Sequence, residues 1–543
     1  MKKRGIATVL AFAMIVGTLA GCGNGQEAKT TAAATTAAAD EVVAKEDTAK
    51  AETGGTAEAD SGLLFEDPVD LTILYMVGEN LGTENLVMKE IFERTNVNAN
   101  LITAPNASYE EKLNSVLASG NLPDIVYLKE YQMDNWVAEG ALIPLDDLIE
   151  EYGSNIKNAL IESDYITLRN VEDGHIYGLP YILRIAAQYA MGIRRDWLQE
   201  LNLEVPTTID ELEAVLTAFK ENQEALGVDN LIPMVGNKSS VGYFTAVFEM
   251  FGISTSGENL AWTLDKDGNY ISIYEHPNYE KCIETLARWY QNGLLDPEYL
   301  TRSQNDMHAL FNSGIAGCGF IFSTRYSTYT NSIREVDPDG FVDYMLPIIG
   351  IDGERRVIGR QELGDRACIT IAAKDKVVEC IKFLDWFYSE EGDTLLNYGI
   401  EGLSYEMVDG KPVITDEYNQ GWDALREIGV VDTGLSYNRN LDAYYQCMLF
   451  GKSIEECDEL ELLTYKAYSE NEPYIVKPLR AFTTETSRTK GTEIYALLAE
   501  KEAKVINGSA TIEEFREALA KAKANGLDDM TREMQACWEA VNK

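Results

Sequence analysis

The sequence predicts an α/β protein with two doubly wound lobes, preceded by an export signal and a spacer. Two observations predict the lobes: strand and helix patterns alternate over residues 71–128, and a second alternation begins at Tyr189. A third observation is that apolar residues make up 45% of the 543 residues, which is ample for folded cores.

The first 22 residues have the layout of a secretory signal peptide. Residues 2–4 are basic, residues 6–19 are apolar, and small residues then lead into Cys22. The apolar run is shorter than the roughly 20 residues that a membrane span needs. The ending Leu-Ala-Gly-Cys resembles a bacterial lipobox, so we expect Cys22 to be lipidated and to hold the protein on the extracytoplasmic face of the cell membrane. The alternative is an ordinary signal with an accidental cysteine.

Residues 23–62 are expected to form a disordered linker. Their composition is largely Ala, Thr, Glu, Lys, Asp and Gly, with few bulky apolar side chains. Such a segment buries too little surface to offset the entropy of ordering it. We therefore expect the folded body to begin near Leu63.

Strand and helix patterns follow one another through the first part of the body. Residues 71–77, 100–103 and 125–128 read as strands, with helical spacing after the first strand. Ser108 and Glu111 have the spacing of a capping box and predict a helix that begins there. Strand, helix, strand, helix, strand is the pattern of a doubly wound lobe.

The same signals recur further along the chain. Thr208 with Glu211, and Thr511 with Glu514, predict two more capped helices. The other predicted elements are strands at 189–193, 316–322 and 367–372, a hairpin turn at 264–270, and helices from Arg195, around Trp289, at 380–388 and around Leu498.

Charge and motif content exclude several functions. The chain has 46 Lys and Arg against 89 Asp and Glu, a net charge of −43, which argues against nucleic acid or an anionic lipid surface as a partner. There are three histidines and no HExxH, GxSxG, GxGxxG or GxxxxGK[ST] motif. We therefore expect no enzymatic activity, no metal and no cofactor.

The cysteines do not form a recognisable framework. Seven remain after Cys22, an odd number, and no pair has CxxC spacing. Cys447 and Cys457 are close enough in sequence to pair, but the sequence leaves their disulfide state open.

Five short motifs occur in order behind the linker: ASGNLPDI at 118–125, YGLP at 177–180, YQNGLLDPEY at 290–299, FNSGIA at 311–316 and NYGIEG at 397–402. With the lipobox and linker, they resemble family 1 extracellular solute-binding proteins, in particular the long lipoprotein branch of carbohydrate ABC-transporter receptors. The resemblance covers nearly all of the body.

The resemblance implies a periplasmic-binding-protein-like fold with several crossovers between the lobes and a hinge. We assign residues 63–180 and 313–372 to the N-terminal lobe, and residues 181–312 and 373–543 to the C-terminal lobe. The implied function is a monomeric receptor that captures an oligosaccharide or related sugar and delivers it to the permease subunits of an ABC importer. Alternatives are a surface-anchored glycan-degrading enzyme and a ligand-sensing subunit of a signalling receptor.

Some members of this family carry an Asp- and Asn-rich calcium loop, and this chain departs from that pattern. The corresponding segment at residues 222–229 lacks carboxylates at alternating positions. Calcium needs several clustered oxygen ligands, so we predict no metal here.

Candidate ligand contacts are aromatic, charged and amide side chains placed just after strands or beside the expected crossings. Aromatic faces pack on sugar rings, and planar polar groups bind hydroxyls. For Trp136, a role on the lobe surface is the alternative. Trp262 lies between a Gly- and Ser-rich loop and a hairpin, where an aromatic platform for a sugar is plausible. The candidates are Asn80, Glu84, Trp136, Tyr181, Arg184, Trp262, Phe322, Arg325, Tyr326, Arg360 and Glu362.

Overall fold

The computed structural model describes residues 63–77, 85–184, 189–237, 243–255, 261–359, 363–419, 422–430, 440–449, 451–480 and 482–541. The predicted signal peptide, the lipidation site Cys22 and the linker at 23–62 lie outside these residues. Residues from Asp60 onward form one compact unit. Within the described residues, no helix combines the length and apolarity that crossing a bilayer would require.

The first lobe is organised around a five-stranded sheet with the order β2-β1-β3-β12-β4. β1, β2 and β3 are parallel, and β12 runs antiparallel between β3 and β4. All four residues of β3 are buried, as expected for a strand covered on both faces. The strands are β1 (Val69–Val77), β2 (Val97–Pro105), β3 (Ile125–Leu128), β4 (Gly178–Ile182) and β12 (Leu363–Ile369).

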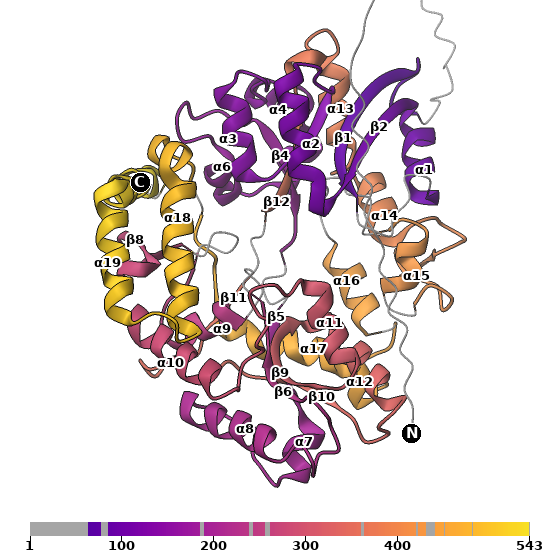
Figure 1. Ribbon diagram of the computed structural model, residues 1–543. Coiled ribbons are helices and arrows are strands. Elements are labelled where there is room, and N and C mark those ends of the chain that lie inside the picture. Colours follow the sequence, from indigo (N-terminus) through magenta and orange to yellow (C-terminus); the bar gives the residue numbers. More distant parts are fainter. Residues whose placement is uncertain are drawn as a thin grey trace, which may run out of the picture. The chain divides into compact units, whose positions relative to one another are not determined.

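Alternate side chains of β1 enter different cores. Ile73 joins a cluster built with α1, α13 and α14, whereas Leu74 joins one built with α2 and α3, so helices cover both faces (Figure 1). The helices of this lobe are α1 (Leu86–Thr95), α2 (Asn106–Ser119), α3 (Glu130–Ala138), α4 (Asp146–Tyr152), α5 (Ser154–Ala159), α6 (Glu162–Leu168), α13 (Val377–Trp386), α14 (Glu390–Tyr398), α15 (Trp422–Glu427) and α16 (Leu441–Met448).

The second lobe is organised around a four-stranded sheet with the order β10-β5-β9-β6. β5 is antiparallel to both neighbours, and β6 is parallel to β9. The strands are β5 (Tyr189–Arg194), β6 (Ile232–Val235), β9 (Ala316–Phe322) and β10 (Val342–Met345). Three two-stranded pairs complete the fold: β7 (Trp262–Leu264) with β8 (Tyr270–Ser272), β11 (Val357–Ile358) with β15 (Ile475–Val476), and β13 (Tyr405–Val408) with β14 (Lys411–Ile414).

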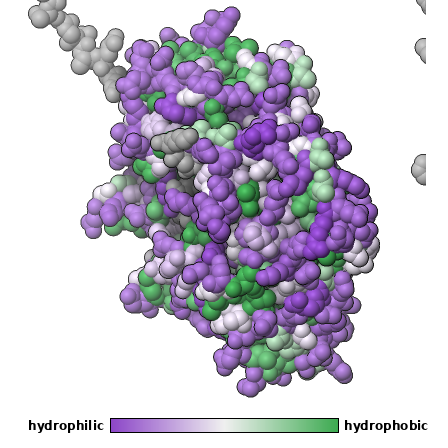
Figure 2. Space-filling view, turned by 90° about the vertical axis from the view of Figure 1, so that its left-hand side faces the viewer, coloured by the Kyte–Doolittle hydropathy of each residue, from purple (hydrophilic) through white to green (hydrophobic). Residues whose placement is uncertain are grey.

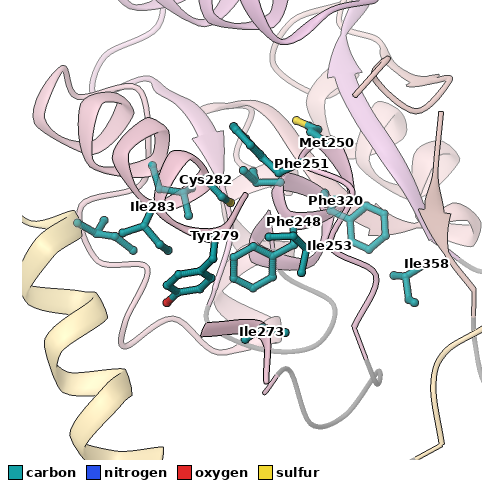
Figure 3. Packing of buried hydrophobic residues seen from close by; sticks show 14 of the residues in the cluster. Phe248, Met250, Phe251, Ile253, Ile273, Tyr279, Cys282, Ile283, Phe320 and Ile358 are labelled. Carbon is teal, nitrogen blue, oxygen red and sulfur yellow. The ribbon is translucent and has the colours of Figure 1, made fainter. Parts of the chain in front are cut away.

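The larger core of the second lobe forms where α9, α10 and β9 meet. Phe248 from α9 lies against Tyr279 from α10, with ring centroids 6.3 Å apart, and Phe320 of β9 contributes to the same cluster (Figure 3). The helices of this lobe are α7 (Arg195–Glu200), α8 (Ile209–Glu221), α9 (Tyr243–Met250), α10 (Tyr279–Gln291), α11 (Gln304–Asn312), α12 (Tyr326–Arg334), α17 (Glu459–Asn471), α18 (Glu485–Ile506), α19 (Ile512–Ala522) and α20 (Asp528–Val541).

The C-terminal helices extend this core. Ile494 and Leu498 of α18 and Phe515 of α19 are buried in the same cluster as Tyr279. Figure 1 shows α18 and α19 side by side in yellow, with α10 next to them. The space-filling view shows a mostly hydrophilic face with separate hydrophobic patches, in keeping with the large negative charge (Figure 2).

Most local signals in the sequence correspond to real elements. The Thr208 and Thr511 capping boxes are both present, and each hydroxyl accepts a backbone N–H bond at the start of its helix. The hairpin turn is confirmed between β7 and β8. The Ser108 capping box is wrong, because α2 already begins at Asn106 and has no side-chain cap.

The predicted assignment of segments to lobes is wrong in two places. β9 and β10 were placed in the N-terminal lobe, but they pair with β5 in the second sheet. α13, α14, α15 and α16 were placed in the C-terminal lobe, but buried residues of all four helices belong to the core of the first. The reason is that β12 returns to the first sheet, and the helices that follow it pack back onto that sheet.

The described cysteines are all free, including Cys447 and Cys457, whose disulfide state the sequence left open. Cys447 is buried in the first lobe, whereas Cys457 is half-buried and its thiol donates to the carbonyl of Leu449 at 3.6 Å.

Candidate functional site

Two chain crossings connect one edge of the first sheet, where β3 and β4 end, with the edge of the second sheet where β9 ends. The chain leaves the end of β4 at Ile182 and enters the second sheet at Tyr189, which begins β5 beside the last residue of β9. It returns from the end of β10, through β11, to Leu363 at the start of β12. In open α/β sheets, ligands bind beyond the carboxyl ends of strands, so these edges form the candidate site.

A pair of short strands lies along this return path. β11 pairs in parallel with β15, and the N–H of Gly359 donates to the carbonyl of Val476 at 2.9 Å. The segment after β15 leads on to α18 of the second lobe. The chain also passes from α16 of the first lobe to α17 of the second, so together with the two crossings above three segments of chain join the lobes.

On the first-lobe side, Arg184 is held rigidly by a buried carboxylate. Its two terminal nitrogens donate to the two oxygens of Asp164, at 2.9 and 2.5 Å. Asp164 also accepts the backbone N–H of Ile161 at 2.9 Å, which fixes the start of α6. Two parallel bonds to a carboxylate set the plane of the guanidinium, so Arg184 presents a defined geometry.

On the second-lobe side, aromatic rings gather at the end of β9. Tyr189 and Phe322 are cross-strand partners, and their ring centroids lie 4.3 Å apart. Phe320 lies 5.7 Å from Tyr189 in a stacked arrangement. Tyr189 and Phe322 are half-buried, so neither residue is fully covered by the rest of the protein.

His308 lies beside these rings, 6.4 Å from Phe322 between ring centroids, and Arg325 follows Phe322 in the chain. His308 of α11 shares a 2.5 Å hydrogen bond with the hydroxyl of Tyr329. Burial, and then the positive charge of Arg325, lower the pKa of His308 to about 4, so the ring is neutral at pH 7. Arg325 is half-buried and lies directly after β9.

Three hollows among the described residues are each too small or too open to enclose a sugar. One of about 10 Å³ is lined by Tyr189, His308 and Phe322, and another of the same size lies beside Glu249. That volume holds about one water molecule. A larger hollow of about 630 Å³ is open to solvent between α8 and α10, and none of its lining residues lies at a strand end.

The comparisons with known proteins agree with this architecture. The family model described as bacterial extracellular solute-binding protein matches residues 77–394, which is more than half of the chain. The chain belongs to this family.

Individual relatives are similar over most of the chain. The fructooligosaccharide ABC transporter substrate-binding protein FusA of Streptococcus pneumoniae is 27% identical, covering 67% of this chain and 69% of the relative. The polygalacturonan/rhamnogalacturonan-binding protein YtcQ of Bacillus subtilis is 23% identical, covering 83% and 88%. Among solved structures, alginate-binding protein AlgQ2 without calcium ion has a TM-score of 0.74 at 23% identity, covering 89% of this chain and all of that one.

Family membership establishes the general class of this protein. It is an extracellular solute-binding protein with the fold of periplasmic binding proteins, and the family description places its members outside the cytoplasm. The relatives named above are binding proteins rather than enzymes.

Three of the predicted ligand residues are core residues instead. Trp136 packs with α2 and β3, Trp262 stacks on Tyr270 at 5.6 Å and donates to the hydroxyl of Tyr495 at 2.9 Å, and Tyr326 is fully buried. All three are 2% exposed or less. In this structure the three side chains therefore belong to the cores and not to an exposed binding surface.

Four other predicted residues lie at the candidate site. Tyr181, Arg184, Phe322 and Arg325 are half-buried and follow or end β4 and β9. Asn80, Glu84, Arg360 and Glu362 lie outside the described residues.

Sequence reasoning missed two residues of this site, Tyr189 and His308. Tyr189 was predicted only as the first residue of a strand. That strand directly follows an expected crossing between the lobes, so its first residue could have been predicted as a site residue from the sequence. His308 lies within a helix, and only the packing of α11 against α12 brings it to the aromatic cluster.

Proposed function

We propose that this protein captures an oligosaccharide or related sugar and delivers it unchanged to an ABC importer. The observation that carries the proposal is the half-buried Tyr189–Phe322 pair at the carboxyl edge of the second sheet. Flat aromatic faces suit the C–H side of sugar rings. The names of FusA, a fructooligosaccharide transporter's substrate-binding protein, and YtcQ, a polygalacturonan- and rhamnogalacturonan-binding protein, support the same ligand class.

Residues from both lobes would share the ligand. We assign ligand contacts to Tyr181 and Arg184 of the first lobe and to Tyr189 and Phe322 of the second, with Arg325 treated below. Arg184 supplies N–H donors of fixed geometry for hydroxyl groups, because Asp164 holds its guanidinium on one side. Asn80, Glu84, Arg360 and Glu362 are proposed from their positions in the sequence alone.

Capture requires the lobes to open and close. A hollow of about 10 Å³ beside Tyr189 cannot hold a sugar ring, so the ligand must enter between lobes that move about the crossing segments. The closed receptor, acting as a monomer, would then dock on the permease subunits of the importer.

A lipid anchor at Cys22 would keep the receptor near its importer. The lipobox-like ending of the signal sequence supports this. We expect the natural protein to partition into the detergent phase of a Triton X-114 extraction, and a Cys22→Ser variant to appear in the aqueous phase or the medium. Equal partitioning of both forms would contradict the anchor.

Thermal stability in the presence of glycans tests the function directly. Ligand at about 100 times its Kd should stabilise the native state by roughly 2.7 kcal/mol and raise the Tm accordingly. Analysis of the same mixtures for shorter sugars should find none. A Tm shift with peptides but with no glycan would overturn the ligand class, and the appearance of shorter products would make the protein an enzyme.

A further inference from the structure

Arg325 is a half-buried cation that makes no hydrogen bond or ion pair with any residue that the structure describes. Other arginines in this acidic chain are held by carboxylates: Arg302 donates to Asp296 at 2.8 Å and Arg480 to Glu130 at 2.9 Å. In a chain with 89 acidic residues against 46 basic ones, an arginine at a strand end that has neither a carboxylate nor a carbonyl partner among the described residues is unusual.

Within the part of the chain that the structure describes, no carboxylate lies within ion-pair distance of Arg325. The residues that feel its charge are His308 and Tyr329, and no acidic side chain contributes to the pKa shift of either. Asp306, the acidic residue of α11, is engaged at the start of its own helix, where it accepts bonds from the N–H and hydroxyl of Ser303, both at 2.8 Å. His308 is neutral at pH 7, so Arg325 is the charged group of this cluster.

Arg325 lies close along the chain to a pair of aromatic rings. Arg325 follows Phe322 by three residues, and the Phe322 ring lies 4.3 Å from that of Tyr189. A pyranose whose C–H face packs on these rings directs its substituents outward along the ring plane. The guanidinium fork binds a carboxylate through two parallel hydrogen bonds, which it cannot do with a single hydroxyl.

We propose that Arg325 binds the carboxylate of a uronic acid residue whose ring packs on Tyr189 and Phe322. This inference rests on the proposed function and narrows its ligand to acidic oligosaccharides. The net charge of −43 would repel such a ligand at long range. At physiological salt, however, the Debye length is about 8 Å, so a local, uncompensated arginine outweighs distant surface charge.

The test is isothermal titration calorimetry with defined glycans on the full folded protein. The panel contains oligomers of galacturonate, guluronate, mannuronate and glucuronate, neutral galacto- and fructo-oligosaccharides of equal length, and sulfated galacto-oligosaccharides. We compare the natural protein with Arg325→Gln, and with Arg334→Gln as the control. Arg334 lies in the last turn of α12, is exposed, and donates to the carbonyl of Gly340, so the control removes the same charge from the same lobe.

The expected result is that a uronate oligomer binds the natural protein most tightly. Arg325→Gln should weaken that binding about 10- to 100-fold, which corresponds to the loss of hydrogen bonds to a charged group. Binding of neutral glycans should stay unchanged, and Arg334→Gln should behave as the natural protein. Arg325→Lys should recover only part of the loss, because lysine cannot make the two parallel bonds.

Other outcomes separate the two proposals. Tightest binding to a neutral or a sulfated glycan, or equal uronate binding by Arg325→Gln, would overturn the carboxylate assignment and leave the proposed function in place. Failure of every glycan to bind the natural protein would overturn the proposed function itself. Because Arg325 lies outside the buried cores, thermal melts of the variants should match the natural protein, and the titrations remain interpretable.

Discussion

Replacing Glu249 with glutamine should remove a large pH dependence from the stability of this protein. Glu249 lies in α9 and is 2% exposed. One carboxyl oxygen accepts the hydroxyl of Ser254 at 2.8 Å, and the other has no hydrogen-bond partner. Burial raises the pKa of Glu249 to about 8, against the opposing charge of Arg356. The group is therefore protonated in the folded protein near neutral pH.

The sign of the effect follows from proton binding. Between the ordinary glutamate pKa of 4.5 and about 8, the folded state holds a proton that the unfolded state has lost. The free energy of unfolding therefore falls as the pH rises through this window. From pH 5 to pH 8 the expected loss is on the order of 3 to 4 kcal/mol, which Glu249→Gln should abolish because an amide does not titrate there.

Urea denaturation at several pH values between 5 and 8 measures this difference. Glu224→Gln is the control, since Glu224 is exposed in the same lobe and should leave the pH profile unchanged. Identical pH slopes for the natural protein and Glu249→Gln would show that the buried carboxyl is not protonated in the native state. The prediction also allows Glu249→Gln to be less stable than the natural protein at every pH, provided that its free energy of unfolding no longer changes with pH in this window.

Arg480→Met should destabilise the protein by about 3 kcal/mol and loosen the contact between the lobes. Arg480 lies between Leu479 and Phe482, which are buried in the core of the second lobe. Its guanidinium nevertheless binds the first lobe: it donates to Glu130 at 2.9 Å and to the carbonyls of Ile166 and Arg169 at 3.3 and 3.0 Å. Methionine keeps much of the side-chain packing but leaves these acceptors without their donor.

The acidic groups around Arg480 increase the expected cost. The side chains of Glu130 and Arg480 are 15% and 12% exposed, so solvent replaces the lost partner poorly. Glu130 keeps only the longer contact to Arg366 at 3.5 Å. Burial and then the charge of Glu130 raise the pKa of Asp134 to about 6, and Arg480 opposes that rise. Its loss should therefore raise this pKa further.

Arg488→Gln is the matched control for Arg480→Met. Arg488 also reaches the first lobe, through Glu172 at 3.4 Å, but the two side chains are 31% and 66% exposed. An exposed pair of this kind contributes about 0–1 kcal/mol. Hydrogen exchange should become faster in α3 and α6 for Arg480→Met only. Equal stability of the two variants would show that Arg480 does not hold the lobes together.

Much of the secondary structure could be predicted because its signals are local. The apolar run at Ile125–Leu128 and the hydroxyl–glutamate spacing at Thr208 act over a few residues, and both elements form where expected. The assignment of segments to lobes could not be predicted in the same way. It depends on where β12 pairs, and the cross-strand partners of β12 lie far away in the sequence.

Single side chains of the candidate site show the same difference between what local sequence predicts and what tertiary packing decides. Trp262 and Phe322 are both aromatic residues at strands, and the sequence predicted ligand contact for each. Tyr270 and Tyr495 contact Trp262 and bury it, whereas Phe322 ends its strand at an edge and stays half-buried. Burial depends on the elements that pack over a residue, and that information is absent from its neighbours in sequence.

By itself, the sequence determined the α/β class and the acidic character of this chain, and its motifs indicated the family. The tertiary structure alone decided which strands share a sheet, which aromatic residues keep a solvent-facing edge, and that Tyr189, Phe322, His308 and Arg325 gather at one strand end. The physical reason is the distance along the chain over which each interaction acts. Periodicity, capping and composition act over a few residues, while sheet pairing and burial are settled by contacts between segments that the sequence leaves far apart.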